Sequence, residues 1–246
     1  MITPMPHGTP SAAAGNTAGV PFWLDQGDLD GLAWPQPAQA NLQSLRFLVS
    51  DGQTFVHDVV QDTDVQIEPP TDDRATWRIT YHDRDGRYRL IEEVWAATQS
   101  NAVLVHATLE ALTGSVLDYQ VYLYAVPALA NSPGDDTVTV NVSEAVAMLS
   151  DRQPTEGSPT FVALVTDTPW VTGSAGYATF ADGLRDLHDF RLDQAFESAG
   201  PGGNPTLTVW LAPAGEWMIA LGLGADAATA RAAAVDGLNE AYQANP

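Results

Sequence analysis

Carboxylates are the side chains most able to do chemistry in this sequence, because two of them flanking a glycosidic bond could hydrolyse it. The closest pairs are Glu92 with Glu93 and Asp182 with Asp186, with Asp189 following the second pair. Adjacent residues of a strand point to opposite faces, so Glu92 and Glu93 cannot act together. Asp182 and Asp186 would share one face of a helix, where a capping or solvated role is the better interpretation. We therefore assign no catalytic residue to the chain.

The five histidines are the other candidate acids and bases: His7, His57, His82, His106 and His188. His57 and His106 fall in segments with strand character, and opening of a sugar ring requires one acid and one base. Neither belongs to a recognisable motif, and a histidine in a strand is more often a hydrogen-bonded structural residue. We expect structural roles for both.

Metal ligation requires ligands at a defined spacing. Asp186, His188 and Asp189 crowd together, and no second cluster accompanies them. Three aspartates also crowd one stretch: Asp25, Asp28 and Asp30. They depart from the order of an EF-hand loop, so we interpret the stretch as a polar turn. The absence of Cys excludes disulfides and zinc thiolate sites, and we expect neither a metal nor a cofactor.

Flat aromatic faces complement the apolar faces of glucose, and the chain has seven tryptophans. We expect Trp34, Trp170 and Trp210 to be exposed and to be the ligand-binding residues for a sugar. Filling of the core between two sheets is the competing interpretation for each of them.

The charge balance narrows the range of partners. Acidic residues number 31 and basic ones 10, all of them Arg, for a formal net charge of −21. Such a field repels phosphate backbones and anionic membrane surfaces, so we expect neither nucleic acid nor a membrane as a partner. A neutral sugar would be indifferent to this field.

The sequence is compatible with more than one cellular location. The first twenty residues lack a cationic n-region and an apolar h-region, so we expect no signal peptide in this chain. No apolar run approaches the ~20 residues that span a bilayer. A chain without Cys fits the cytoplasm, and it equally fits a mature secreted fragment.

Apolar and polar residues alternate with a period of two through the central part of the chain, which predicts strands. Residues 45–59 form one predicted hairpin around Asp51-Gly52, and residues 76–95 form a second around Gly86. Further strands are expected at 102–112, 118–126, 137–142, 144–149, 160–166, 206–211 and 217–223. Repeated short strands favour an antiparallel sandwich over a parallel α/β fold.

Only two segments have helical character. Residues 182–187 could form a short helix, and the Ala-rich segment 226–244 has apolar residues at helical spacing behind Asp226, a plausible N-cap. Pro, Gly, Ala, Ser and Thr dominate residues 1–19, which predicts a flexible lead-in, and we expect one domain over residues 20–246.

Several short sequence segments occur in the same order as in a known domain family. Residues 45–55 read Leu-Arg-Phe-Leu-Val-Ser-Asp-Gly-Gln-Thr-Phe, preceded by residues 22–29 and by Trp34-Pro35. Residues 83–90 form the next hairpin, and residues 121–132 contain Pro-Ala-Leu-Ala-Asn. Together these blocks resemble the N-terminal domain of the bacterial glucoamylases and glucodextranases of glycoside hydrolase family 15.

Two later blocks extend this resemblance from about residue 20 to the C-terminus. Residues 181–187 resemble the family's Ser-Asp-Gly-x-x-Asp-Leu segment. Residues 217–224 and the Ala-rich helix resemble its closing strand and the start of its linker to a catalytic barrel. Two departures stand out: the turn at 28–31 is more polar than the family norm, and the family's opening usually has more ordered residues than residues 1–20 supply.

The resemblance implies an all-β fold, a large antiparallel two-sheet supersandwich of the galactose mutarotase-like kind, with a short C-terminal helix. In the family the general acid and base are carboxylates of an (α/α)₆ barrel, and none of them maps onto this chain. The implied function is that of a non-catalytic accessory domain of α-glucan hydrolysis, which packs against a glucosidase barrel and stabilises it. Separated from a barrel, such a domain should expose an apolar patch through which it could self-associate.

Two alternatives remain open at this point. A stand-alone carbohydrate-binding module, with an α-glucan as its partner, would carry a line of exposed Trp on one sheet. A small sugar isomerase of the mutarotase type would need a concave sheet face on which a His and a carboxylate converge.

Overall fold

The computed structural model describes residues 9–10, 19–72, 75–132, 134–151, 154 and 158–244. Most of the expected lead-in, together with His7, lies outside the described residues. Thr9 and Pro10 are described, and they pair with the first long hairpin of the chain. None of the helices in these ranges combines the length and the apolar character that a bilayer crossing requires.

The strands are β1 (Thr9–Pro10), β2 (Phe22–Asp25), β3 (Asp28–Leu32), β4 (Leu42–Ser50), β5 (Val56–Asp58), β6 (Thr63–Glu68), β7 (Trp77–Asp83), β8 (Tyr88–Ala96), β9 (Ala102–Ala111), β10 (Gln120–Pro127), β11 (Thr137–Asn141), β12 (Val146–Asp151), β13 (Thr160–Thr166), β14 (Trp170–Tyr177), β15 (Ser198–Ala199), β16 (Pro205–Leu211) and β17 (Glu216–Gly224). The α-helices are α1 (Val59–Asp62), α2 (Gly183–Asp186) and α3 (Ala227–Ala244). Short 3-10 turns are η1 (Val116–Asp118), η2 (Leu129–Asn131), η3 (Val142–Glu144) and η4 (Leu187–Asp189).

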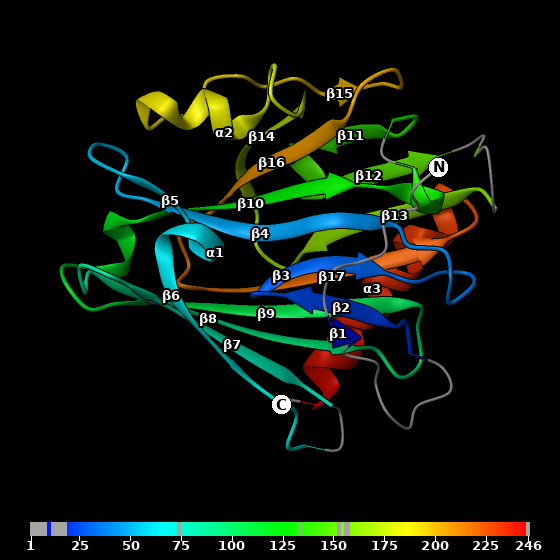
Figure 1. Cartoon of the computed structure of the whole chain (residues 1–246), viewed down its shortest axis with the longest axis horizontal. Coiled ribbons are helices and arrows are strands. Elements are labelled where there is room, and N and C mark those ends of the chain that lie inside the picture. Colours follow the sequence, from blue (N-terminus) through cyan, green and yellow to red (C-terminus); the bar gives the residue numbers. More distant parts are fainter. Residues whose placement is uncertain are drawn as a thin grey trace.

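All pairings between these strands are antiparallel, and they build two large sheets and one small one (Figure 1). The large sheets have the orders β15-β11-β12-β13-β17-β9-β8-β7-β6 and β14-β16-β10-β4-β5. Both contribute to one buried hydrophobic cluster, to which Phe47 and Leu123 belong on one side and Val105 and Trp217 on the other. The predicted antiparallel sandwich is confirmed.

The small sheet, β1-β2-β3, packs beside β4 and adds Phe22, Leu29 and Leu32 to the same core. It was not predicted as a sheet. At its turn, Gly27 has a φ of +100°, and a Cβ there would lie 3.0 Å from the Tyr81 hydroxyl. Only glycine therefore lets the hairpin close against β7.

The predicted C-terminal helix, α3, covers the outer face of the nine-stranded sheet. Its buried side chains are mostly alanines, so the helix comes very close to the strands. A Cβ on Gly222 of β17 would lie 2.2 Å from the Ala234 nitrogen and 2.3 Å from the Ala230 oxygen. The predicted N-cap is also confirmed, because the Thr229 amide donates to Asp226 Oδ1 at 2.8 Å.

Candidate functional site

Glu92 and Glu93 lie on opposite faces of β8, as predicted. Glu92 points into the sandwich and is 3% exposed. Glu93 points outward, where its Oε1 accepts from Arg78 Nη1 of β7 at 2.6 Å. The two carboxylates therefore cannot flank one substrate.

Glu92 is buried beside Tyr81 and Asp28. Burial raises the pKa of Glu92 to about 8, the hydrogen bond with Tyr81 opposes this rise, and the Asp28 carboxyl adds to it. Tyr81 donates its hydroxyl hydrogen to the Gly27 carbonyl at 2.8 Å, and Glu92 Oε1 is buried without a hydrogen-bond partner in the described structure. A carboxyl group enclosed in this way is out of reach of a substrate, so we assign Glu92 no catalytic role.

Asp28 is a second largely buried carboxylate, and it does more than the predicted polar turn required, although the chain does turn at Gln26-Gly27. It opens β3 and accepts from Ser44 Oγ at 2.7 Å and from the Leu45 amide at 3.0 Å. Burial raises its pKa to about 6, against the effect of Ser44 and of Arg46. Arg46 also pairs with Asp58 at 3.2 Å. Asp28 thus anchors the small sheet to β4.

Asp182 and Asp186, the second carboxylate pair, also have structural roles. Asp182 Oδ1 accepts from the Arg185 amide at 3.0 Å and caps α2, which confirms the predicted capping role. Asp186 Oδ2 accepts from the Gln194 amide at 2.8 Å, and Asp189 is exposed. These side chains fix α2 and the segment after it.

His57 lies in a closed polar cluster at one end of the sandwich. Its Nδ1 is 3.1 Å from the Tyr88 hydroxyl and 3.3 Å from Asp83 Oδ1, and its Nε2 is 3.3 Å from Arg87 Nη2. Burial, followed by the nearby Arg87 charge, lowers the pKa of His57. Arg87 is itself held by Asp83 and lies 4.1 Å from the centre of the Phe55 ring. The expected structural role of His57 is confirmed.

His106 belongs to a different cluster, on the outer face of the nine-stranded sheet. Its Nε2 lies 2.6 Å from Glu216 Oε1, and its Nδ1 lies 3.4 Å from Glu93 Oε2. With the Arg78–Glu93 pair, these contacts form a row of polar side chains across β7, β8, β9 and β17. No contact links this row to His57, so the acid and base of a sugar isomerase are not brought together by these two histidines in the described structure.

The remaining candidate ligands stay apart. His82 is partly buried on β7, and His188 is exposed in η4. Among the described residues, no three His, Asp or Glu side chains are placed to hold a metal ion.

The three tryptophans predicted to bind sugar share no surface. Trp170 is only 5% exposed and its indole nitrogen donates to Thr166 Oγ1 at 2.8 Å, so the expected exposure is wrong there. The reason is that Trp170 opens β14 facing the core. Trp210 lies on the other face of the same sheet, partly buried with its ring centre 5.9 Å from that of Tyr122. Trp34 follows β3 and packs partly buried against the core. Sugar binding by them stays a prediction, which the burial of Trp170 argues against.

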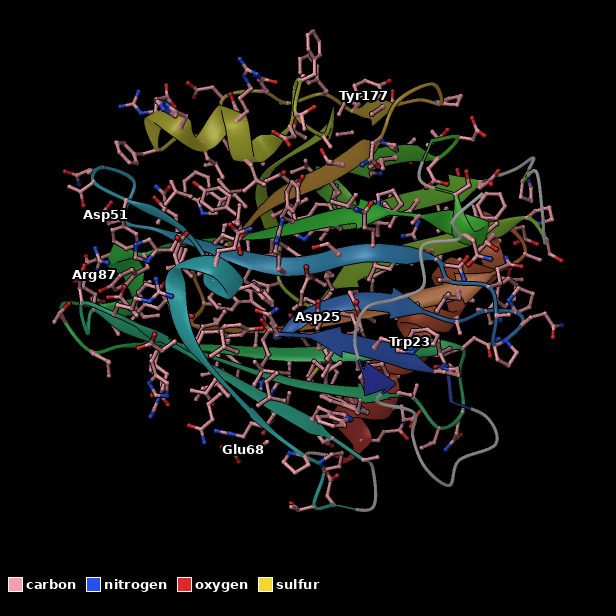
Figure 2. The ribbon with its side chains drawn as sticks, viewed as in Figure 1. Trp23, Asp25, Asp51, Glu68, Arg87 and Tyr177 are labelled. Atoms are coloured by element: carbon pink, nitrogen blue, oxygen red, sulfur yellow. The ribbon has the colours of Figure 1, made fainter. Side chains whose placement is uncertain are left out.

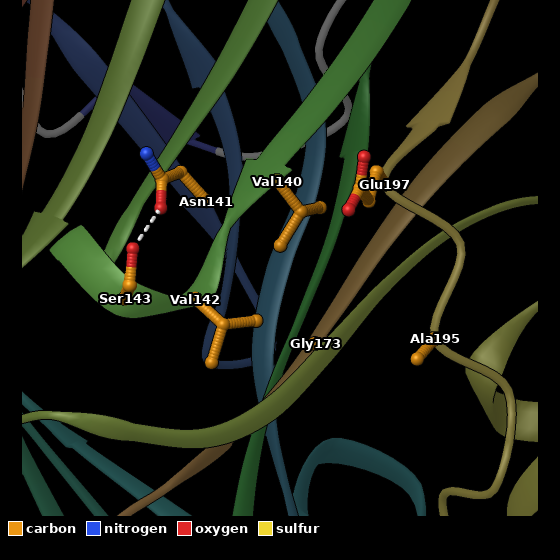
Figure 3. A pocket seen from close by; sticks show the side chains of 7 residues that line it. All are labelled: Val140, Asn141, Val142, Ser143, Gly173, Ala195 and Glu197. Atoms are coloured by element: carbon orange, nitrogen blue, oxygen red, sulfur yellow. Dashed lines mark hydrogen bonds between the residues drawn. The ribbon is translucent and has the colours of Figure 1, made fainter.

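A notch of about 520 Å³ opens where the edges of the two large sheets meet (Figure 3). It is lined by Val140, Asn141, Val142, Ser143, Gly173, Ala195 and Glu197. Figure 3 shows Asn141 and Ser143, which share a hydrogen bond of 2.8 Å, on one side of the β11 ribbon and Glu197 on the other. The polar groups do not converge, so the notch has no arrangement for chemistry.

A groove of about 350 Å³ lies between the β6–β7 connection and the outer face of β8. It is lined by Glu68, Pro69, Thr71, Asp72, Thr76, Arg78, Glu93 and Trp95. Figure 2 shows Glu68 in the lower part of the molecule and Arg87 at its left edge. Sequence reasoning missed this groove, because β6 was not predicted and the register that places Arg78 opposite Glu93 appears only in the folded sheet.

Comparison with known proteins gives concordant matches. The family model described as glucodextranase, domain N, matches residues 9–245. A glucoamylase from Clostridium sp. (strain G0005) is 26% identical over 223 residues, which are 90% of this chain and 31% of that enzyme. A bacterial glucoamylase structure in complex with acarbose superposes with a TM-score of 0.82 at 25% identity, over 96% of this chain and 34% of that one.

More distant structures share the fold alone. A family GH92 inverting mannosidase from Bacteroides thetaiotaomicron has a TM-score of 0.56 at 11% identity, over 94% of this chain and 30% of that one. This chain spans about a third of the length of the glucoamylases that it matches. Because the family model covers nearly every residue, and the motifs from residue 20 onward had indicated the same relationship, the chain belongs to the glucodextranase domain N family.

Proposed function

We propose that this chain is a non-catalytic accessory domain of α-glucan hydrolysis, which packs against a glucoamylase-type catalytic barrel and stabilises it. The observation that carries the proposal is the coverage: nearly all of this chain matches only about a third of each glucoamylase. The remaining two thirds of such an enzyme is large enough to contain a barrel and its catalytic carboxylates.

The chemistry of the chain supports the same proposal. Glu92 is neutral and enclosed, Asp182 caps a helix, and Asp186 holds a backbone amide. Hydrolysis of a glycosidic bond requires two accessible carboxylates across a cleft. Neither the Glu92–Glu93 pair nor the Asp182–Asp186 pair provides this arrangement.

The surface that would contact the barrel is the connection between β9 and β10. Leu112 and Leu117 are 55% and 67% exposed there. The connection is nevertheless held firmly, because the Arg87 carbonyl accepts from the Leu112 amide at 2.9 Å and from the Thr113 amide at 3.0 Å. A capping box between Ser115 and Asp118 fixes the next turn. Rigid, exposed leucines are typical of a surface that another body covers.

A chimera tests the proposal. This chain would replace the matching third of the Clostridium glucoamylase, beside a version that lacks that third. We expect the chimera to retain glucoamylase activity after heating that inactivates the shortened version, because binding to the folded state stabilises it. Equal inactivation of the two versions would contradict a stabilising role.

The two alternatives have less support. None of the seven tryptophans is exposed, so no line of Trp marks a sugar-binding sheet face. The histidines that an isomerase would use lie in separate clusters. Calorimetric titration with maltooligosaccharides and isomaltooligosaccharides distinguishes the accessory domain from a carbohydrate-binding module, because only the binding module gives saturable heat.

A further inference from the structure

We propose that residues 178–197 form a cover that opens as a unit from the outer face of the five-stranded sheet, while the two large sheets stay paired. The cover connects β14 to β15 and contains α2 and η4. Its helix α2 lies against β14 and β16 (Figure 1). Opening of the cover gives solvent access to aromatic side chains on this sheet face.

A small apolar cluster, separate from the core of the sandwich, holds the cover on the sheet. The cover contributes Leu187 and Leu192, which are buried, and Leu184, which is partly buried. The side chains from the sheet and its edge are Leu48, Val56, Tyr122, Tyr124, Val126 and Trp210. The main core lies on the other face of the same sheet. Loss of the cover contacts therefore leaves that core intact, as in a local opening of a folded protein.

Two polar atoms of β16 are enclosed beneath the cover. Thr208 Oγ1 and Trp210 Nε1 have no hydrogen-bond partner in the described structure. Thr208 lies beside Gly183 of α2, and the Trp210 ring lies beside that of Tyr122. An enclosed polar group has given up its bonds to water, and without a replacement this cost weakens the closed state. Opening restores access of water to both atoms.

The two ends of the cover are held to the sheets, and its middle is not. At one end, Tyr177 and Ala181 exchange two backbone hydrogen bonds of 3.0 Å. At the other end, the Phe196 carbonyl accepts from the Ala175 amide at 2.8 Å. Between 182 and 195, the described structure has a single hydrogen bond from the cover to the sheet, in which the Tyr124 hydroxyl donates to Asp182 Oδ2 at 3.3 Å. The ends can therefore act as hinges.

Hydrogen bonds within the cover let it move as one body. The Asp182 carboxylate caps α2 by accepting from the Arg185 amide at 3.0 Å. Asp186 Oδ2 accepts from the Gln194 amide at 2.8 Å and so ties α2 to the segment that follows η4. Neither bond involves a residue of the sheet, so both can persist when the cover opens.

Gly183 provides a way to force the cover open. A Cβ at this position would lie 2.1 Å from Thr208 Oγ1 and 2.4 Å from Thr208 Cβ, so Gly183→Ala acts as a wedge between α2 and β16. Gly200, just after β15, has no atom within 4 Å of the position of its Cβ. Neither glycine has a positive φ. Gly200→Ala is therefore the matched control.

Single cysteines test the opening directly, because the chain has no cysteine of its own. Thr208→Cys places a thiol beneath the cover, and Val209→Cys places one on the core face of the same strand. A neutral thiol reagent avoids repulsion by the acidic chain. We expect Thr208→Cys to react at least about tenfold faster than Val209→Cys, because the second thiol is reached only when the sheets separate.

The wedge should act on the first thiol alone. In the Thr208→Cys background, we expect Gly183→Ala to speed the reaction by about tenfold or more and Gly200→Ala to leave it unchanged. Equal reaction rates of the two single cysteines, or equal effects of the two glycine substitutions, would overturn the proposal.

A measurement on the unaltered protein keeps the test independent of how the variants fold. The Trp217 indole nitrogen donates to the Ala212 carbonyl at 2.9 Å inside the core, so its hydrogen exchanges only on wider unfolding. We expect the Trp210 indole N–H to exchange faster than that of Trp217 in NMR spectra, while the backbone amides of β16 stay protected. Equally slow exchange of the two indoles would show that the cover stays closed.

Discussion

Buried carboxyl groups give the sandwich an unusual dependence on pH at the scale of single residues. Burial raises the pKa of Glu92 to about 8 from an ordinary 4.5, and raises the pKa of Asp136 to about 8 and of Asp28 to about 6. A raised carboxyl pKa means that the folded state favours the protonated form. Its contribution to stability is present below the unfolded pKa and is lost as the pH rises through the folded one.

We therefore expect the free energy of unfolding to fall between pH 4.5 and pH 8, with Glu92 alone contributing on the order of 3 kcal/mol. Glu92→Gln, which keeps the shape and removes the charge, should flatten this fall and be more stable than the wild type at pH 8. Glu93→Gln is the outward-facing control and should keep the slope. Urea unfolding at pH 5 and pH 8 measures the change in the free energy of unfolding with pH. If this change were the same in Glu92→Gln as in the wild type, Glu92 would not be its source.

Gly27 makes a second prediction at this scale. Gly27→Ala combines a φ of +100° with a Cβ that would lie 3.0 Å from the Tyr81 hydroxyl, so we expect a loss of about 2 kcal/mol. Gly86 also has a positive φ, of +71°, but no atom lies within 4 Å of the position of its Cβ. Gly86→Ala should therefore cost only about 1 kcal/mol, from backbone strain. Equal losses in thermal unfolding would show that contact with Tyr81 does not matter.

At the scale of elements, the close packing of α3 predicts sensitivity to side-chain size on one helix face. Ala234 is fully buried against β17, whereas Ala232 is exposed. Ala234→Leu should destabilise the chain by about 1–3 kcal/mol because the helix must move away from the sheet. Ala232→Leu should change stability by less than about 0.5 kcal/mol. Chemical denaturation of the two variants compares them directly, and similar midpoints would count against close helix packing.

The elements that the sequence predicted are those with local signals. Asp51-Gly52 and Gly86 marked the two hairpins, and helical spacing behind Asp226 marked α3. The missed strands lack such signals: β14 has two glycines among its eight residues, and β6 is a mostly exposed strand at the edge of its sheet. The predicted strand at 144–149 begins only at Val146, because η3 and the left-handed Ala145 precede it.

The candidate site was harder to predict than the strands, for a physical reason. Whether Glu92 is buried, or Arg78 lies opposite Glu93, depends on which strands pair and on which face the core forms. Alternation placed Glu92 and Glu93 on opposite faces, but it could not identify the buried one. The prediction that Trp170 is exposed was wrong for a similar reason, because a tryptophan is compatible with the core as well as with the surface.

At the scale of the whole molecule, the proposed contact with a barrel depends on the exposed leucines of the β9–β10 connection. In the chimera, replacing Leu112 and Leu117 by Ser should remove most of the gain in heat resistance, because their contact with the barrel would be lost. Phe180→Ser is the control, since Phe180 is 79% exposed, precedes α2 in the chain and is not part of the β9–β10 connection. Residual glucoamylase activity after heating is the readout. A larger effect of Phe180→Ser would place the contact elsewhere.

The place of β17 in the nine-stranded sheet has a consequence for synthesis. This strand, which follows all others in the chain, lies between β13 and β9 and pairs with both. Until Glu216–Gly224 has left the ribosome, the two halves of the sheet each carry an unpaired edge. Such edges can pair with other chains, so nascent domains are vulnerable to aggregation until late in translation. The sandwich closes only when its final strand is made, immediately before α3 covers it.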